Sequence, residues 1–225
     1  MPLLLMDLDN TLVDRDAAFR AAVAAFLAEH GLPAADVDWV MAVDASGYAP
    51  RAALAEALNG RYGHVVPAAV VEALLDREAV DRVTLAPATR AALDTARTQG
   101  WTRVIITNGC TAQQEAKIRR SGLDRLVEGW VVSEDVGHKK PAPEIFRAAA
   151  EAGGVDLPGA WVIGDVAHAD IAGAHRLGLH SVWVSNGRSW TEDAFRPTRV
   201  ATDVATAIGH AIGTYAPDVP ETGVR

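Results

Sequence analysis

Residues 3–11 of the chain, LLLMDLDNT, join a short apolar run to two carboxylates that stand two positions apart. An unbroken apolar run of this length is typical of a strand buried on both faces of a parallel sheet. The chain turns just past the end of such a strand, so Asp7 and Asp9 can face the same crevice. This stretch therefore predicts the first strand of an α/β fold, with an acidic site at its carboxyl end.

The same pattern recurs later in the chain. Apolar runs at residues 103–106, 161–163 and 181–184 each meet a polar stretch, and a further strand is expected at 130–133. Helical spacing and glycine stops predict the intervening helices, at 19–30, 111–122, 143–152 and 168–177. The residues Thr111 to Gln114 have the form of a capping box that starts the second of these helices. The alternation predicts a Rossmann-like doubly wound parallel sheet.

One interval is too long for this scheme. More than ninety residues separate Asp7 from the strand that begins near Trp101, whereas one crossover helix needs a βαβ unit of about 30 residues. The surplus is helix-rich and predicts an inserted α-helical subdomain. We expect a core domain at 1–15 plus 83–214, a helical insert at 16–82, and a C-terminal tail at 215–225.

Composition excludes several classes of protein. The 225 residues are 49% hydrophobic and 22% charged, as in an ordinary globular protein that can bury a core. A net charge of −8 with no basic cluster argues against nucleic-acid binding. No apolar run approaches the ~20 residues that span a bilayer, so no membrane contact is expected. Cys110 is the only cysteine and is expected to be a small core residue, and a reducing cytoplasm is the expected compartment.

A second acid pair and two further polar residues follow the other strands. Asp165 and Asp170 come after the strand at 161–163, Thr107 follows the strand at 103–106, and Lys140 precedes a proline. Carboxylates gathered at one sheet edge would repel one another unless a cation bound there. Oxygen ligands without cysteine favour Mg²⁺. The hydroxyl of Thr107 and the ammonium of Lys140 complete the set of groups that phosphoryl transfer requires, because that reaction depends on positioning and charge neutralisation.

These residues resemble the four motifs of the haloacid dehalogenase-like (HAD) hydrolase superfamily. The first motif is similar to DLDNT at residues 7–11, the second to Thr107-Asn108, the third to Lys140-Pro141, and the fourth to Gly164-Asp165 with Asp170. The stretch from 133 to 146 resembles the subfamily whose helical cap is inserted after the first motif. Ala142 and Val166 depart from it, because relatives often carry Asp and Ser there. The resemblance spans residues 3 to about 205 and implies the HAD-like core with an inserted cap.

The resemblance also implies roles for the motif residues. Asp7 would be the nucleophile that forms an aspartyl-phosphate, and Asp9 the general acid and base. Thr107, Asn108 and Lys140 would bind the phosphoryl group. Mg²⁺ would be held by the side chains of Asp7 and Asp165 and by the backbone carbonyl of Asp9, with Asp170 in support. The implied activity is hydrolysis of a small-molecule phosphate monoester by a monomer or homodimer.

Other reactions occur on the same scaffold. Haloacid dehalogenases lack the second carboxylate of the first motif, so Asp9 argues against dehalogenation. Phosphonate hydrolases use a cap lysine as a Schiff base, and the insert at 16–82 contains no lysine. Sugar phosphomutases carry a hinge histidine about where this chain has Phe19, so mutase activity is a weaker alternative. A phospho-accepting signalling domain would be shorter, and a non-catalytic binding protein would have lost a motif residue.

The insert is expected to close over the site and select the substrate, a small phosphorylated metabolite. Residues 44–48 read as a loop that faces the crevice. Candidate contacts are Trp39, Tyr48, Arg51 and Arg61. Arg51 is the preferred one, because a second anionic or polar group on the substrate would need a fixed donor.

Overall fold

The computed structural model describes residues 1–77 and 79–213. Its centre is a six-stranded, entirely parallel sheet with the strand order β3-β2-β1-β4-β5-β6. The strands are β1 (Leu3–Met6), β2 (Thr102–Thr107), β3 (Gly129–Val132), β4 (Trp161–Gly164), β5 (His180–Val184) and β6 (Arg199–Ala201). The order reverses between β1 and β4, as in doubly wound folds, so ligands are expected at the carboxyl ends of these two strands.

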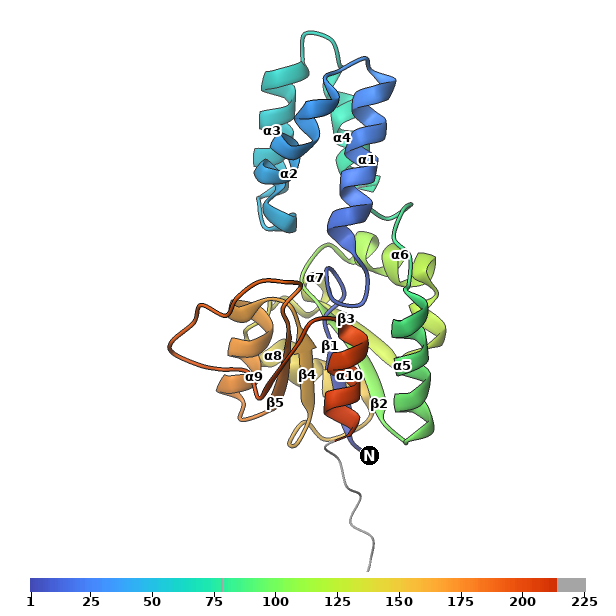
Figure 1. The fold of residues 1–225 in the computed structure, drawn as a ribbon, viewed down its shortest axis with the longest axis vertical. Helices are drawn as coiled ribbons and strands as arrows, with labels where there is room; N and C mark the ends of the chain where they lie inside the picture. Colours follow the sequence, from blue (N-terminus) through green and yellow to red (C-terminus); the bar gives the residue numbers. More distant parts are fainter. Residues whose placement is uncertain (78, 214–225) are drawn as a thin grey trace, which may run out of the picture.

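Helices fall into two groups (Figure 1). Four of them form a bundle beyond the carboxyl edge of the sheet: α1 (Arg15–Glu29), α2 (Val37–Asp44), α3 (Arg51–Tyr62) and α4 (Ala68–Arg77). The others surround the sheet: α5 (Pro87–Thr98), α6 (Thr111–Ser121), α7 (Ser133–Val136), α8 (Pro143–Gly153), α9 (Ala172–Arg176) and α10 (Val204–Ile212). None of the helices within residues 1–77 and 79–213 has the length and apolarity that a bilayer crossing demands.

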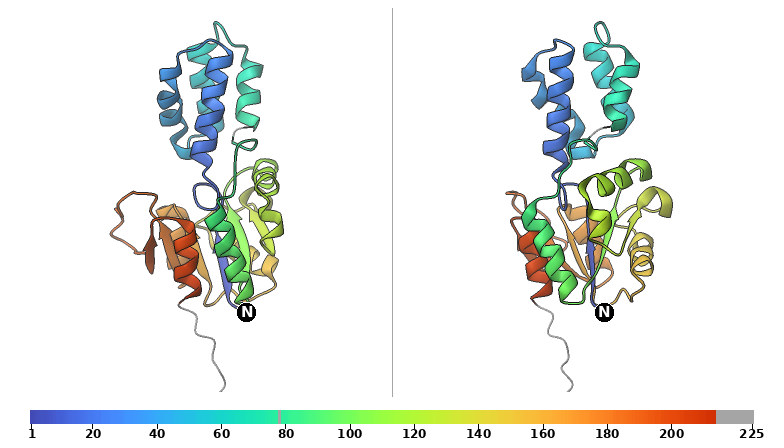
Figure 2. Two further views of the ribbon diagram at one scale, coloured as in Figure 1. Left: turned by 45° about the vertical axis from the view of Figure 1, so that its right-hand side comes forward. Right: turned by 90° about the vertical axis from the view of Figure 1, so that its right-hand side faces the viewer.

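Alternate strand residues supply the two faces of the sheet, because successive side chains of a strand point in opposite directions. Leu3 and Leu5 pack with α8, whereas Leu4 and Met6 join the core shared by α5 and α10. Figure 2 shows these helices on opposite sides of the sheet. The core on the α5 and α10 face continues through Leu8 into the α1–α4 bundle. One apolar cluster therefore connects the sheet to the bundle.

Most expected elements are confirmed, with three differences. The helix expected at 168–177 consists of a π-helical turn at Ala167–Ile171 followed by α9, and this turn carries Asp170. The capping-box prediction is wrong, since Cys110 is the N-cap and Gln114 is directed elsewhere. The short edge strand β6 was not predicted, because its three residues carry too little pattern to stand out. The tail expected at 215–225 lies outside the described residues.

A close contact between α8 and α9 generates a stability prediction. A Cβ placed on Gly173 would lie 2.3 Å from the ring of the fully buried Phe146. We therefore expect Gly173→Ala to lower the free energy of unfolding by about 1–3 kcal/mol, since overpacking forces neighbours to move. Urea unfolding monitored by tryptophan fluorescence measures the change.

Gly209→Ala in α10 is the matched control, because a Cβ there would meet no atom within 4 Å. It should leave stability unchanged or raise it by up to about 1 kcal/mol, through helix propensity. An equal unfolding free energy for the two variants would contradict the packing argument at Gly173.

Candidate active site

The carboxyl ends of three adjacent strands bring the sequence motifs together. Asp7 follows β1, Asp165 follows the neighbouring β4, and Thr107 is the last residue of β2 on the other side. The backbone N–H of Asp7 donates to the carbonyl of Ile163 at 2.9 Å, which extends the hydrogen-bond ladder between β1 and β4 to Asp7. The parallel register therefore fixes these side chains at one edge although more than 150 residues separate Asp7 from Asp165.

Three carboxylates meet at this edge. Asp7, Asp165 and Asp170 each offer an oxygen within 4.8 Å of the others, and all three are buried. The Lys140 ammonium lies among them, 2.6 Å from Asp7 Oδ1 and 2.7 Å from Asp170 Oδ1, and it also donates to the carbonyl of Ile106 at 2.8 Å. One buried cation thus contacts two of the three acids.

Burial and mutual repulsion change the titration of this cluster. Burial raises the pKa of Asp7, and the charges of Asp170 and Asp165 add to the effect while Lys140 opposes it. Burial and the charge of Asp170 likewise raise the pKa of Asp165 to about 7, against the influence of Arg188. For Lys140, burial opposes the charged form, but Asp170 and Asp7 outweigh it and raise the pKa. Full ionisation of the three acids is therefore disfavoured by burial and by their mutual repulsion, and two cations, Lys140 and Arg188, contact them.

Asn108 positions Lys140 through two backbone contacts. Its Oδ1 accepts from the Lys140 N–H at 2.8 Å, and its Nδ2 donates to the Lys140 carbonyl at 3.1 Å. The Lys140-Pro141 peptide bond that follows is cis. Asn108 is itself adjacent to Thr107, so the second and third motifs form one connected unit.

Asp170 depends on a glycine in β4. A Cβ on Gly164 would lie 2.2 Å from the Asp170 carboxylate, so only glycine leaves room for it. The backbone N–H of Val166 donates to Asp170 Oδ2 at 3.0 Å. Asp170 is fully buried, and its Oδ1 accepts from the Lys140 ammonium at 2.7 Å.

Arg188 contacts Asp165 and was not singled out in the sequence. Its Nη2 lies 2.9 Å from Asp165 Oδ2 and 2.8 Å from the Asp165 carbonyl. The hydroxyl of Thr11 lies 3.4 Å from Asp165 Oδ1. Arg188 belongs to the loop after β5, and a lone arginine in a polar loop carries no pattern that would single it out.

Asp9 lies beside the cluster and is held by α6. Lys117 Nζ lies 3.0 Å from Asp9 Oδ1 and 2.8 Å from Oδ2. Gln114 Nε2 donates to Asp9 Oδ2 at 3.0 Å and to Thr107 Oγ1 at 2.6 Å. Neither residue was predicted. A signal existed, because Gln114 and Lys117 share the helix face of the buried Ile118, where an apolar side chain is the norm.

A pocket of about 820 Å³ opens over these residues, between the sheet edge and the helical bundle. Asp7, Asp9, Thr107, Asn108 and Lys140 line its core side. Its opposite side includes Tyr48 and Arg51, which lie in or after the predicted loop. Cys110 also lines the pocket and is exposed, so its predicted place in the core is wrong: α6 begins at Thr111, and the side chain precedes the buried helix face.

A buried ion pair shapes the bundle side of this pocket. Arg15 at the start of α1 bonds both carboxylate oxygens of Asp44 at the end of α2, and its guanidinium lies over the ring of Phe19. Asp44 Oδ2 also accepts from the N–H of Gly47 at 2.9 Å. A Cβ on Gly47, whose φ is +81°, would lie 3.3 Å from Arg15 Cζ. The pair therefore fixes the turn that leads to Tyr48.

The four candidate contacts of the insert separate into two groups. Tyr48 and Arg51 line the pocket. Arg61 instead bonds both carboxylate oxygens of Asp36 and covers the ring of Trp39. The expectation of substrate contacts at Trp39 and Arg61 is therefore not met, since this charge and ring pair with each other on the surface of the bundle, and neither residue lines the pocket.

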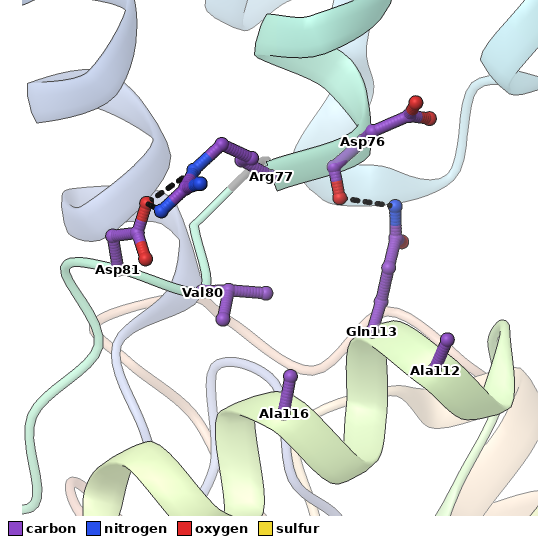
Figure 3. A pocket seen from close by; sticks show the side chains of 7 residues that line it. All are labelled: Asp76, Arg77, Val80, Asp81, Ala112, Gln113 and Ala116. Carbon is purple, nitrogen blue, oxygen red and sulfur yellow. Dashed lines mark hydrogen bonds and ion pairs between the residues drawn. The ribbon is translucent and has the colours of Figure 1, made fainter.

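A second, smaller pocket lies where α4 approaches α6 (Figure 3). Gln113 points from α6 toward the end of α4, where its Nε2 donates to the carbonyls of Leu75 and Asp76 at 3.3 and 3.1 Å. Its Oε1 accepts from Arg51 at 2.8 Å. Gln113 thus links α6 to the bundle at two points, between the carbonyl end of one helix and a side chain at the start of another.

The acidic cluster has the chemistry of a metal site. Three buried carboxylates supply hard oxygen ligands. Burial, and after it the charge of neighbouring carboxylates, raises the pKa values of Asp7 and Asp165, and a bound divalent cation would oppose both effects. Lys140 and Arg188 supply two positive charges against the three acids, which leaves the ionised carboxylates in excess. Asp7, Asp165 and Asp170 therefore fit a metal of the Mg²⁺ type.

Comparison with solved structures supports the fold. The dehalogenase structure with a TM-score of 0.75 is 19% identical, and the alignment covers 97% of this chain and 98% of that one. YfnB from Bacillus subtilis, solved with magnesium bound, has a TM-score of 0.74 at 23% identity over 93% of this chain and 98% of its own. Such levels of identity show a shared architecture.

Sequence relatives align over a shorter region. Glyceraldehyde 3-phosphate phosphatase from Pyrococcus abyssi is 37% identical over 102 residues, which are 45% of this chain and 43% of the relative. Pyrimidine 5'-nucleotidase YjjG from Escherichia coli is 37% identical over 95 residues, or 42% of each protein. The matches span less than half the length of these relatives.

A family description matches far more of the chain. The sequence pattern described as haloacid dehalogenase-like hydrolase matches residues 1–178, which include all the site residues named above except Arg188. The parallel sheet with its reversal between β1 and β4 and the four motifs at its carboxyl edge agree with that match. This chain belongs to the haloacid dehalogenase-like hydrolase family.

Proposed function

We propose that this protein is a Mg²⁺-dependent phosphatase that hydrolyses a small-molecule phosphate monoester through an aspartyl-phosphate on Asp7. The observation that supports this most is the lining of one pocket, about 820 Å³ in volume, by Asp7, Asp9, Thr107, Asn108 and Lys140. A nucleophile, an acid and base, hydroxyl and amide donors, and a fixed cation are thereby available to one bound phosphate.

In the first step, a carboxylate oxygen of Asp7 attacks phosphorus and the bond to the leaving alcohol breaks. Asp9 donates a proton to the departing oxygen. The Thr107 hydroxyl and the Asn108 N–H bind the phosphoryl oxygens, and the Lys140 ammonium offsets charge between the nucleophile and the phosphate. Atoms balance, because the alcohol leaves with the proton of Asp9 and the phosphoryl group stays on Asp7.

In the second step, water attacks the phosphorus of the aspartyl-phosphate. Asp9, now a carboxylate, takes the proton of this water, and inorganic phosphate leaves as Asp7 is restored. The Asp9 carboxyl carries 26% of its possible exposure, so water can reach it. One carboxyl therefore serves both steps in opposite protonation states.

Asp7 and Asp165 would hold the magnesium ion with their side chains, Asp9 with its backbone carbonyl, and Asp170 would support them. Bound there, Mg²⁺ supplies positive charge that neutralises the phosphate. The excess of buried negative charge in this cluster supports the assignment.

Asp9 favours phosphatase chemistry over dehalogenation. A halide leaves as a stable anion and needs no proton, whereas an alkoxide does. The relatives named as phosphatases and as a nucleotidase are consistent with this choice.

We infer that residues 16–82 form the cap and select the substrate. Tyr48 and Arg51 stand across the pocket from the phosphate site. The Arg51 guanidinium lines this pocket and donates to Gln113 at 2.8 Å, so it places a permanent positive charge there. The proposed substrate is a small phosphorylated metabolite that carries a second anionic or polar group. The proposed compartment is the cytoplasm, because its reducing environment keeps a free thiol such as that of Cys110 reduced.

Asp7→Asn tests the nucleophile. An amide oxygen cannot form the aspartyl-phosphate, so we expect phosphate release from p-nitrophenyl phosphate with Mg²⁺ to fall by at least about 10³-fold. Asp94→Asn on the exposed face of α5 is the control and should keep the full rate. Unchanged turnover in Asp7→Asn, or no release by the unaltered protein, would refute the proposal.

Asp165→Asn tests the metal site without a rate measurement. Loss of one charged oxygen ligand should weaken Mg²⁺ binding, measured by isothermal titration calorimetry, by about tenfold or more. Asp193→Asn, at an exposed position of the same charge type, should bind Mg²⁺ as the unaltered protein does. Equal affinities in all three proteins would exclude Asp165 as a ligand.

Arg51→Ala tests substrate selection by the cap. A charge-assisted hydrogen bond contributes about 1.5–3 kcal/mol, so KM for phosphoserine should rise about tenfold while KM for p-nitrophenyl phosphate stays within about twofold. Arg61→Ala removes the same charge from a residue that pairs with Asp36 instead, and both KM values should hold. Matching KM profiles for the two variants would remove Arg51 from the substrate site.

A further inference from the structure

Lys117 occupies an unusual position for a lysine. Its side chain is 2% exposed, on the face of α6 that also buries Ile118. Lysine is almost never fully buried without a partner, because removing an ammonium from water costs several kcal/mol. Both oxygens of Asp9 serve as that partner, at 3.0 and 2.8 Å. An apolar residue would fill this helix face at lower cost, so the charge requires an explanation beyond packing.

The two contacts define the orientation of the Asp9 carboxylate. A single bond would leave the carboxyl group free to swing, whereas an ammonium that contacts both oxygens fixes the direction in which the group points. Asp9 lies in the loop after β1, where no strand ladder restrains its side chain. Restraint therefore comes from α6, a separate element of the core.

Gln114 ties this arrangement to the phosphate side of the pocket. Its Nε2 lies 3.0 Å from Asp9 Oδ2 and 2.6 Å from Thr107 Oγ1, so one amide spans the two groups. A Cβ on Gly109, whose φ is +152°, would lie 3.0 Å from Gln114 Cγ. Glycine at 109 thus gives the amide its space. Lys117 and Gln114 are one helical turn apart and approach Asp9 from the same side.

We propose that Lys117 is a positioning residue that sets the Asp9 carboxyl group for proton transfer to the leaving oxygen, with Gln114 as its second support. The inference rests on the proposed phosphatase function, in which Asp9 is the acid and base. Lys117 acts through Asp9, and its own ammonium forms no bond to the reacting phosphorus. Loss of Lys117 should matter where the leaving group needs a proton.

The experiment compares two substrates in Lys117→Met. p-Nitrophenolate leaves without protonation, whereas the alcohol of 2-glycerol phosphate needs a proton. The ratio kcat/KM reports the steps up to loss of the alcohol. Misplacing a catalytic group can cost up to about 100-fold, so kcat/KM for 2-glycerol phosphate should fall about 10- to 100-fold, while that for p-nitrophenyl phosphate stays within about threefold. Arg119→Met is the matched control on α6, because Arg119 is exposed and pairs with Glu115; both values should hold.

The outcomes are distinct. An equal fall with both substrates would mean general damage to the site and would overturn the proposal, and so would unchanged values with both. Inactivity of the unaltered protein toward both substrates would refute the phosphatase function itself. Thermal unfolding checks that Lys117→Met folds. If it does not, Lys117→Gln, which keeps a polar group of similar length, is compared in the same way and is expected to show the same selective fall.

Discussion

The contact of the Lys140 ammonium with Asp7 and Asp170 is the interaction on which the site depends. Several buried carboxylates in one place are unfavourable unless positive charges lie beside them. Lys140 supplies part of this positive charge, and Asn108 fixes Lys140 through hydrogen bonds to its backbone N–H and carbonyl. The negative charge that remains on the carboxylates would attract a divalent cation. The same arrangement therefore stabilises the sheet edge and supports the proposal that a metal and an anionic substrate bind there.

The doubly wound sheet delivers these groups because its strand order reverses at β1 and β4. At that point the connections of neighbouring strands leave in opposite directions, and the carboxyl edge opens into a crevice. The first and fourth motifs follow the two strands on either side of the reversal, and the second ends β2 next to them. Gly164 then gives Asp170 the space to return from the following turn. The strand order thus brings the motif residues together, and single residues such as Gly164 adjust the geometry of the site.

Two helices connect the proposed reaction centre to the proposed cap. From α6, Lys117 and Gln114 reach Asp9, while Gln113 of the same helix reaches the end of α4 and Arg51. From α1, Arg15 fixes Asp44 and so the turn before Tyr48. One face of α6 therefore contacts the acid and base candidate, and its first turn contacts the bundle. This arrangement gives the proposed cap a direct structural route to the proposed reaction centre.

Local sequence pattern was enough to predict the fold class, five of the six strands and the motif residues, because each depends on a short stretch of chain: an apolar run, a glycine stop, an acid after a strand. Which polar residues outside the motifs join the site became visible only in the folded structure. Gln114 has the form of half a capping box, yet its amide reaches Asp9 instead. Arg61 and Arg51 look alike in sequence, yet Arg61 pairs with Asp36 and Arg51 lines the pocket. These differences depend on which charged side chains meet between elements that are far apart in the sequence. Local spacing of residues does not reveal such contacts.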